Sequence, residues 1–444
     1  MTPSSCEFTG STMTFFRNNK RFLRLLLVLL FIVTVVWFTW TLIRIKPFGS
    51  TVTFHMPITT KLCVSETADS ELTLATLHSF LFLWKTKDVP CRRSYQTFNR
   101  FYSVVQTHGE ILIESEKFRE KVRHWLGDNE TLFKQVFSQN ITAIYNHYTH
   151  EETLFNALRS KRPVSQPEVS DLDYIEDIQG KTKADCDFCR YKEYTAHDLS
   201  GRLENRHAVT AANTFRYDRM HQLILSRGHH PLQWSKEQFM AMFELAHQWL
   251  LQSYKSEPSY IYPLIMWDVL PHGGASQVHP HLQVVLKSHR YPGNAESWRL
   301  AAQEYMREHN SNYFTDLISV YDSLGLSVRY KSSVAIATLT PKKDNEIVII
   351  CKDALLDFYS LLYYVIRAYV DDMKIYPFSM ALTLPAMDQS TPDMPAFIRI
   401  ITRGTASEIR SDISSLELFS FNNVASDPYK LVRQIKASIR KRDV

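Results

Sequence analysis

The chain has 444 residues, of which 45% are hydrophobic, 22% are charged and only 12 are glycine. This composition excludes collagen-like, low-complexity and wholly disordered proteins, and the length allows two domains with extensions. The formal charge of +5 comes from 51 basic and 46 acidic side chains. Nucleic-acid-binding proteins usually carry a clustered basic excess, so we expect no nucleic-acid partner.

The N-terminal region predicts a membrane anchor. Residues 25–43 include no charged residue, and these 19 residues would span about 28 Å as a helix, close to the hydrocarbon thickness of a bilayer. More basic residues precede this run (Arg17, Lys20, Arg21, Arg24) than follow it (Arg44, Lys46). The positive-inside rule then predicts a cytosolic tail over 1–24 and a single-pass type II protein whose body lies in the lumen of the Golgi apparatus or endoplasmic reticulum. The run is too long for a signal peptide and lacks a small-residue cleavage site.

Several features of the next part of the chain fit a lumenal location. Asn129 and Asn140 each begin an Asn-x-Thr triplet, which predicts glycosylation if they are exposed. Cys63 and Cys91 could form a disulfide in an oxidising compartment. We interpret 44–154 as a helical, aromatic-rich lumenal stem of open role, and the acidic, proline-containing stretch after it as a linker.

The rest of the chain predicts an α+β fold with two ββαββ units and antiparallel sheets, the first over 155–325 and the second over 326–444. In the first unit, Ser235 and Gln238 form a capping box that opens a helix. In the second, a helix is expected to begin at Asp353. The expected strands are 207–212, 220–226, 260–268 and 278–286 in the first unit, and 333–339, 346–351, 378–384 and 396–402 in the second.

The last strand of the first unit carries the candidate chemistry. With a period of two, His279, His281 and Gln283 share one strand face. A neutral buried imidazole is a capable nucleophile toward phosphorus, and the small-residue loop before it can offer backbone N–H groups to phosphate oxygens. The pattern therefore favours phosphate-ester chemistry over a solvated polar strand.

The segment from Gly274 to Gln283 resembles the Gly-x-Ser-x-x-His-Pro-His-x-Gln signature of galactose-1-phosphate uridylyltransferases, a branch of the histidine-triad (HIT) superfamily. Three further pieces resemble family segments in the same order: 158–163, Cys186 to Cys189, and 226–229. The resemblance covers about 155–440. It implies a HIT-like fold with two repeats, here in a membrane-anchored member. The last strand of the second repeat carries Arg399 and Arg403 and has no counterpart of the histidine pair, so we expect this repeat to be catalytically degenerate.

The resemblance also implies roles for individual residues. His281 would attack the α-phosphorus of a nucleoside diphosphate sugar and form a nucleotidyl-histidine, with His279 beside it in the catalytic motif. Gln283, Gly274, Ala275 and Ser276 would bind the phosphate oxygens. Asp268 falls where the family usually carries Asn against the phosphates, and a carboxylate there would repel phosphate unless it is protonated or turned away.

A metal site is predicted from four residues. Cys186, Cys189, His229 and His279 form an S₂N₂ set suited to tetrahedral zinc. The two histidines lie where the family provides the remaining ligands, so we expect a structural zinc that fixes the strand end carrying His281. His230 in place of His229, or a Cys186–Cys189 disulfide without metal, are the alternatives.

The expected function is a uridylyltransferase-like nucleotidyltransferase, and its partners are a nucleotide-sugar substrate, the membrane and, as an open alternative, a second copy of the chain. The same intermediate would serve a phosphorylase or a hydrolase of nucleotide sugars or dinucleotides. A non-catalytic nucleotide-sugar-binding protein is a further alternative. A glycosyltransferase using Asp171 and Asp173 as an Asp-x-Asp metal site is less favoured, because that triplet lies in an acidic stretch.

Overall fold

The computed structural model describes residues 27–35, 37, 52–64, 72–163 and 168–443, and it divides the chain into two units, Met1–Thr51 and Val52–Val444. In the first unit, 27–35 and Trp37 are helical and exposed. No helix among the described residues is long and apolar enough to cross a membrane. The predicted tail at 1–24 and residues 25, 26, 36 and 38–43 of the predicted anchor lie outside the described residues, so the tail and the anchor stay predictions.

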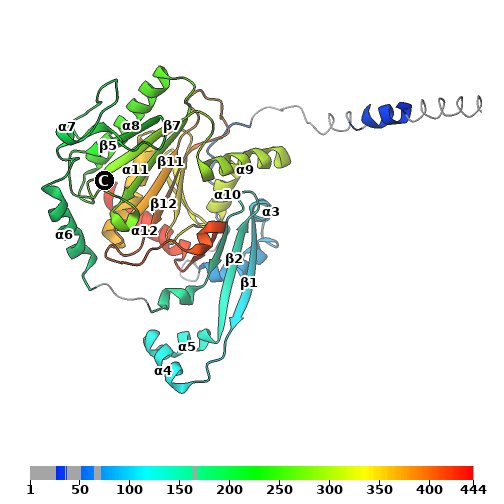
Figure 1. Ribbon diagram of the computed structural model, residues 1–444. Helices are drawn as coiled ribbons and strands as arrows, with labels where there is room; N and C mark the ends of the chain where they lie inside the picture. The colour runs from blue at the N-terminus through cyan, green and yellow to red at the C-terminus, as the bar shows by residue number, and fades with distance from the viewer. Residues whose placement is uncertain (1–26, 36, 38–51, 65–71, 164–167, 444) are drawn as a thin grey trace, which may run out of the picture. The chain divides into compact units, whose positions relative to one another are not determined.

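A nine-stranded sheet organises the second unit (Figure 1), and all its neighbouring strands are antiparallel. In spatial order the strands are β4 (Ala208–Ala212), β5 (Met220–Ser226), β7 (His281–Lys287), β6 (Tyr262–Val269), β11 (Phe378–Thr383), β12 (Ala396–Thr402), β10 (Ile347–Cys351), β9 (Ser333–Ala337) and β8 (Ser327–Tyr330). The eight predicted strands are therefore all present. The two ββαββ repeats join through the β6–β11 pair into one continuous sheet.

Two long helices in equivalent positions of the repeats pack on the sheet. They are α8 (Lys236–Ser256), which contacts β4, β5 and β7, and α11 (Leu356–Arg367), which contacts β9 and β10. The Ser235–Gln238 capping box is confirmed, whereas α11 begins three residues after Asp353, with Leu355 at its N-cap. Alternate residues of the central strands, such as Trp267 and Leu282, enter the same buried core as α8, so the other sheet face is free to carry functional groups.

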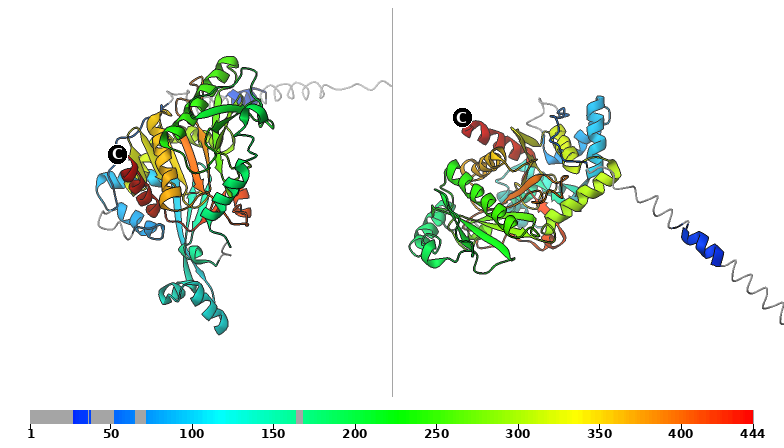
Figure 2. Two further views of the ribbon diagram at one scale, coloured as in Figure 1. Left: turned by 90° about the vertical axis from the view of Figure 1, so that its left-hand side faces the viewer. Right: turned by 90° about the horizontal axis from the view of Figure 1, so that it is seen from above.

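Further helices surround the sheet. The α-helices are α6 (Asp171–Lys183), α7 (Tyr191–Tyr194), α9 (Gly293–His309), α10 (Tyr313–Leu324) and α12 (Pro428–Arg442), and the short helical turns are η2 (Leu74–Thr76), η3 (Ala157–Lys161), η4 (Pro271–Gly273), η5 (Ala368–Asp372) and η6 (Ser415–Phe419). Figure 2 shows this arrangement from two further directions.

The prediction of a helical stem over 44–154 is only partly right. The region contains α2 (Leu77–Trp84), α3 (Val89–Phe101), α4 (Glu116–Trp125) and α5 (Glu130–Val136), but also β1 (Tyr102–Glu110) and β2 (Ser138–Asn146). These two strands form a second sheet with β3 (Glu152–Phe155) and with β13 (Phe421–Val424) from the C-terminal part of the chain. The β1–β2 hairpin carries α4 and α5 at its end away from the large sheet (Figure 1).

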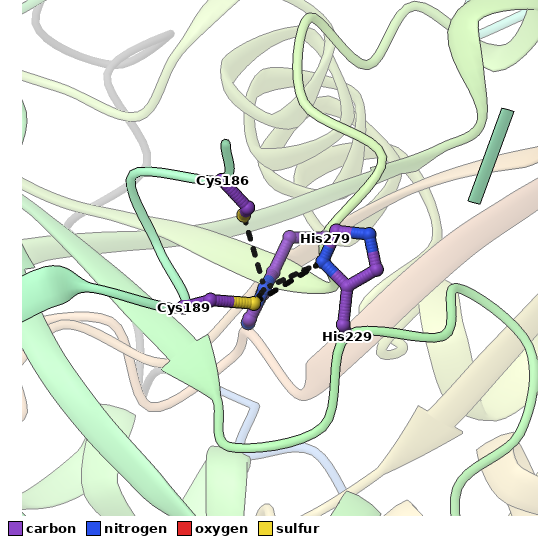
Figure 3. A group of neighbouring side chains, drawn as sticks. All are labelled: Cys186, Cys189, His229 and His279. Atoms are coloured by element: carbon purple, nitrogen blue, oxygen red, sulfur yellow. Dashed lines mark hydrogen bonds between the residues drawn. The ribbon is translucent and has the colours of Figure 1, made fainter. Parts of the chain in front are cut away.

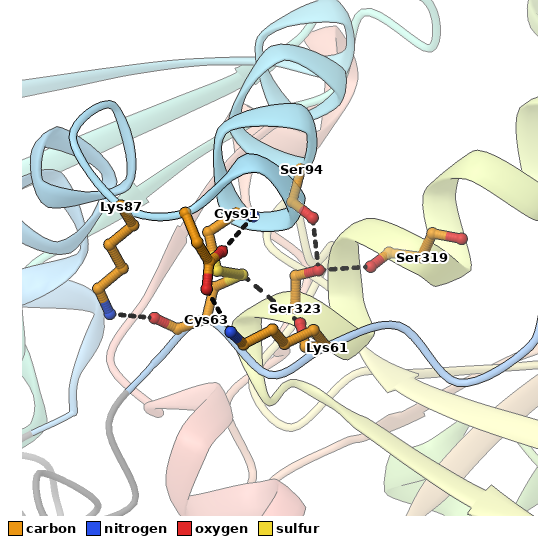
Figure 4. Close-up of a disulfide and its surroundings, with 8 residues drawn as sticks. Lys61, Cys63, Lys87, Cys91, Ser94, Ser319 and Ser323 are labelled. Atoms are coloured by element: carbon orange, nitrogen blue, oxygen red, sulfur yellow. Dashed lines mark hydrogen bonds and ion pairs between the residues drawn. A yellow bond between two sulfur atoms is a disulfide. The ribbon is translucent and has the colours of Figure 1, made fainter.

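The disulfide proposed from the sequence is present. Cys63 and Cys91 are bonded, with a Cα–Cα distance of 5.6 Å (Figure 4). The backbone N–H of Cys63 donates to the carbonyl oxygen of Ser323 at 2.9 Å, and the hydroxyl groups of Ser94 and Ser323 lie 2.8 Å apart. The bridge thus holds the segment before α2 and the start of α3 against the end of α10.

The acidic linker prediction is wrong for its second half, because α6 begins at Asp171. Ser170 caps this helix by accepting a hydrogen bond from the N–H of Asp173 at 3.2 Å. The Asp171 carboxylate accepts bonds from the N–H and the hydroxyl of Ser407, at 3.0 and 2.8 Å. Acidic residues are favourable at a helix N-terminus, and this placement explains the Asp-x-Asp triplet without a metal.

Candidate functional site

The His-Pro-His segment lies where a loop enters β7. Strand β7 begins at His281, so His279 precedes it and only His281 and Gln283 follow the predicted alternation. Leu282 and Val284 point into the core shared with α8, which leaves His281 and Gln283 on the opposite face. The apolar alternation of the strand therefore aims the imidazole of His281 away from the helices.

The hydrogen bonding of His281 fixes its tautomer. Its side chain is 8% exposed, and its Nδ1 lies 2.9 Å from the carbonyl oxygen of His279. A carbonyl oxygen only accepts, so Nδ1 carries the proton and Nε2 keeps its lone pair. Burial lowers the pKa of His281, although the His279 carbonyl and the nearby Asp268 carboxyl oppose this. The result is a neutral imidazole with an available Nε2, the form that attacks phosphorus.

A loop with an unusual backbone precedes His281. Gly274 has a φ of +100°, in the left-handed region that favours glycine. A Cβ at Gly273 would lie 3.2 Å from the carbonyl oxygen of Phe378, so the loop also needs a glycine there to approach β11. Gly274 and Ser276 are exposed whereas Ala275 is buried. The two exposed residues can meet a ligand, and Ala275 contributes to the loop's packing.

Asp268 and Gln283 lie on the strands beside this loop. Asp268 on β6 faces Ser379 on β11. Burial raises the pKa of Asp268, although Ser379, Arg403 and His281 counteract the shift. The side-chain oxygen of Gln283 is buried, and the Gln283 side chain lies within hydrogen-bonding reach of His221 on the neighbouring strand β5.

The structure brings the four predicted metal ligands together (Figure 3). Their ligand atoms all lie within 4.8 Å of one another. The Nδ1 atom of His279 is 3.5 Å from each cysteine sulfur, and the Nδ1 atom of His229 is 3.3 Å from the Cys189 sulfur. Both thiols are free, so the structure has a Cys₂His₂ cluster and no Cys186–Cys189 disulfide.

His229 occupies the fourth position, and the alternative ligand His230 does not. The Nε2 atom of His230 lies 3.3 Å from the carboxylate of Glu176, while its Nδ1 accepts hydrogen bonds from the N–H groups of Leu232 and Gln233. Its ring is therefore turned to α6 and to its own loop, away from the cluster.

The chemistry of the cluster fits a divalent cation. His279 donates from Nε2 to the carbonyl oxygen of Ser226 at 2.7 Å, so its Nδ1 lone pair points at the sulfurs. Burial lowers the pKa of His279 to about 4, which keeps it neutral. Burial and the neighbouring Cys186 thiol raise the pKa of Cys189 to about 11, and a bound cation would reverse this by stabilising the thiolate. The cluster could hold a metal ion such as zinc.

Three residues near His281 were missed by the sequence analysis. Phe188, between the two cysteines, packs its ring edge-on against His281 with centroids 5.1 Å apart. Ser379 donates to the carbonyl oxygen of Gly273 at 2.7 Å, and Arg403 donates to the same oxygen at 3.1 Å. Arg403 also lines a cavity of about 990 Å³. Ser379 and Arg403 come from the second repeat, so no local pattern around the histidines could have indicated them.

No protein-family model matches the chain, and no curated protein matches its sequence. Solved structures do resemble it. An ADP-glucose phosphorylase from Arabidopsis thaliana with bound ADP-glucose gives a TM-score of 0.51 at 15% identity, covering 65% of this chain and 96% of that one. A uridylyltransferase gives 0.48 at 15% identity, covering 67% and 98%. A GalT-like protein from Arabidopsis thaliana gives 0.47 at 16% identity, covering 56% and 91%. The first of these likenesses confirms the expected α+β fold with antiparallel sheets.

Proposed function

We propose that this protein is a HIT-like nucleotidyltransferase that acts on a nucleoside diphosphate sugar, with His281 as the nucleophile. The observation that carries the proposal is the state of His281. It is buried and neutral, its Nδ1 proton is bound to the His279 carbonyl, and its Nε2 is available beside a glycine loop. A structural role alone would not require an unprotonated nitrogen next to such a loop.

The proposed reaction proceeds by two displacements. Nε2 of His281 attacks the α-phosphorus, the bond from that phosphorus to the bridging oxygen breaks, and its electrons leave with the sugar 1-phosphate. An acceptor then attacks the nucleotidyl-histidine, and the P–N bond breaks to restore the imidazole. The exposed Gly274 and Ser276 face the developing charge, and Gln283 is placed to contact a phosphate oxygen through its amide.

We propose zinc for the Cys186–Cys189–His229–His279 cluster, because two thiols and two imidazole nitrogens match its preferred tetrahedral set. When bound, zinc would take no part in the transfer, and these four residues would be held together at the ends of the segments that carry them. The chain's own contribution follows from His279, whose side chain is in the cluster and whose carbonyl oxygen holds the proton of His281. Positioning His279 therefore positions the nucleophile.

The cellular setting is also a proposal. The uncharged run at 25–43 supports a type II anchor, and the Cys63–Cys91 disulfide agrees with a Golgi or endoplasmic reticulum lumen. Both predicted glycosylation residues are exposed: Asn129 is the N-cap of α5 and Asn140 lies on β2. Endoglycosidase treatment of the full-length protein from cells should increase its electrophoretic mobility, and Thr131→Ala with Thr142→Ala should abolish that change without altering either asparagine.

The function is tested by trapping the intermediate. The purified lumenal part, 52–444, forms a compact unit and is incubated with UDP-, ADP- and GDP-sugars and with dinucleoside polyphosphates, each labelled in the nucleotide. We expect acid-labile label on the protein with at least one of them, and none on His281→Ala. The matched control is His289→Ala, which changes an exposed histidine just after β7 and should keep the label. Label that persists on His281→Ala would contradict the proposal.

A further inference from the structure

Asp268 lies in line with the proposed nucleophile. The register that pairs Met266 with Gln283 places Asp268, two residues further along β6, level with His281 on β7. On the other side, Asp268 pairs with Ser379 on β11. Residues opposite one another on antiparallel strands point to the same face. His281, Asp268 and Ser379 thus form a row across three adjacent strands.

The carboxyl group of Asp268 also lies against the glycine loop. A Cβ added to Gly274 would be 3.7 Å from the Asp268 Cγ and 3.8 Å from its Oδ1. The loop residue best placed to accept a phosphate therefore has a carboxyl group beside it. Any anion bound by this loop lies close to the charge of Asp268.

No cation neutralises this charge directly. The charge of Arg403 counteracts the raised pKa of Asp268, but the Arg403 guanidinium forms its ion pair with Asp412. The Arg403 Nε lies 2.6 Å from the Asp412 carboxylate. The Nη1 atom of Arg403 donates to the carbonyl oxygen of Gly273 and to the hydroxyl oxygen of Ser379. Within the ranges that the structure describes, Asp268 forms no ion pair, and its side chain is only partly buried.

We infer that Asp268 selects the second substrate: it accepts the proton of a neutral hydroxyl group, water or an alcohol, that attacks nucleotidyl-His281, and it disfavours phosphate dianions as acceptors. This inference rests on the proposed function and names the acceptor class for the same site. A carboxylate level with the nucleophile and beside the glycine loop repels inorganic phosphate and sugar phosphates, which carry nearly two charges at neutral pH. A hydroxyl group meets no such repulsion and needs a base.

The second displacement then balances without a further reactant. The O–H bond of the acceptor breaks and its proton moves to the Asp268 carboxylate. The acceptor oxygen forms a bond to the α-phosphorus, and the electrons of the P–N bond return to Nε2 of His281. The products are a nucleoside monophosphate when water attacks or a nucleotidyl ester when an alcohol attacks, and Asp268 afterwards releases its proton to solvent.

The same carboxylate is compatible with the first displacement. The α-phosphate carries one charge in the bound nucleotide sugar, and the sugar 1-phosphate that leaves becomes a dianion, whose departure from the site the carboxylate favours. Burial raises the pKa of Asp268, which makes the carboxylate a stronger base than an exposed one. The groups that face it are His281 on β7, Ser379 on β11 and Arg403 after β12, and none of them is another acid.

The test measures how the nucleotidyl-enzyme divides between acceptors. Wild-type 52–444 and Asp268→Asn are charged with the labelled nucleotide sugar found above, freed of excess substrate, and mixed with buffer alone, inorganic phosphate, hexose 1-phosphate or glycerol. In the wild type we expect nucleoside monophosphate as the main product, with glycerol ester as the second. In Asp268→Asn we expect hydrolysis to slow by about 100-fold. The ratio of phosphate transfer to hydrolysis should rise by at least about tenfold.

The controls separate charge from shape and from folding. Asp268→Glu keeps the charge and should keep the preference for neutral acceptors, which also serves if Asp268→Asn does not fold. Asp388→Asn changes an exposed aspartate on the loop after β11 and should behave as the wild type. Equal partitioning in the wild type and Asp268→Asn would overturn this inference while leaving the proposed function intact. If neither protein forms labelled enzyme, the proposed function fails, and this inference fails with it.

Discussion

The two halves of the nine-stranded sheet share a strand order and a helix position but use them differently. In the first half, the face of β7 away from α8 carries Gln283 and His281, and the His281 imidazole makes a single hydrogen bond within the described part of the chain, from its Nδ1. In the second half, the corresponding strand β12 carries Arg399, which lies 2.5 Å from the carboxylates of both Glu151 and Glu346. The comparison shows that one scaffold can present a neutral imidazole on the last strand of one repeat and a buried ion-pair cluster on the last strand of the other.

The halves are also joined at the site. Ser379 and Arg403, from the second half, hold the carbonyl oxygen of Gly273 in the first. The second half, which has no histidine pair of its own, therefore supports the loop before the nucleophile. The following predictions test this division, with chemistry assigned to one half and support to the other.

The largest effect is expected in the first half. His281→Ala should lower turnover by at least about a thousandfold, because the proposed covalent intermediate forms on the Nε2 atom that this change removes. Its thermal midpoint should change by only a few degrees, since the imidazole makes one hydrogen bond, to the His279 carbonyl. Steady-state kinetics and calorimetry measure the two effects. Residual turnover within about tenfold of the wild type would contradict the division.

The complementary change lies in the second half. Arg399→Met should destabilise the protein by about 3 to 5 kcal/mol, because it leaves the buried carboxylate of Glu346 without its ion-pair partner and Glu151 with Lys342 alone. Denaturant unfolding measures this loss. The protein that remains folded should still form the nucleotidyl-enzyme at the wild-type rate.

A second variant checks the origin of that loss. Arg399→Met combined with Glu346→Gln should be more stable than Arg399→Met alone, because the unpaired charge of Glu346 is then removed. A combined loss equal to the sum of the two single losses would show that the ion pair is not responsible.

The metal cluster should have an intermediate effect. Cys186→Ser should remove bound zinc, measured as metal per chain, and lower activity by about 10- to 100-fold through the displaced His279. Cys351→Ser is the matched control, because Cys351 is also a buried free thiol but lies on β10, outside the cluster. If Cys186→Ser and Cys351→Ser retain equal amounts of metal, the cluster is not the site.

The smallest effect is expected where the halves meet. Ser379→Ala removes one hydrogen bond to Gly273 and should cost about 1 kcal/mol, which corresponds to a roughly fivefold lower rate of nucleotidyl-enzyme formation. Ser390→Ala, in the exposed loop after β11, serves as a control for stability. Rapid-quench measurement of labelled enzyme would detect the difference. An unchanged rate would mean that the loop is held without the second half.

Much of the fold could be predicted because its signals are local. The eight strands of the repeats show as apolar runs, and the Ser235–Gln238 capping box marks the start of α8. The Cys₂His₂ cluster followed from residue types and spacing, together with the family resemblance. These features depend on side chains close in sequence or on motifs with a defined order.

The missed features depend on distant parts of the chain. In the small sheet, β3 pairs with β13, which lies some 270 residues later in the chain. Neither strand carries a local sequence pattern that indicates its partner. The joining of the two repeats through β6 and β11 also depends on tertiary pairing. The acidic residues from Asp171 onward predict a linker, but they form the first turn of α6. The N-terminus of a helix is where acidic side chains are most favourable.

The most direct test of the account is to locate the nucleotidyl group within the trapped enzyme. Rapid proteolysis at alkaline pH, followed by tandem mass spectrometry, should find the added mass on the peptide that contains β7 and assign it to His281 alone. Assignment to His279, to a residue of the second half, or to no residue in an enzyme that is demonstrably turning over would contradict it.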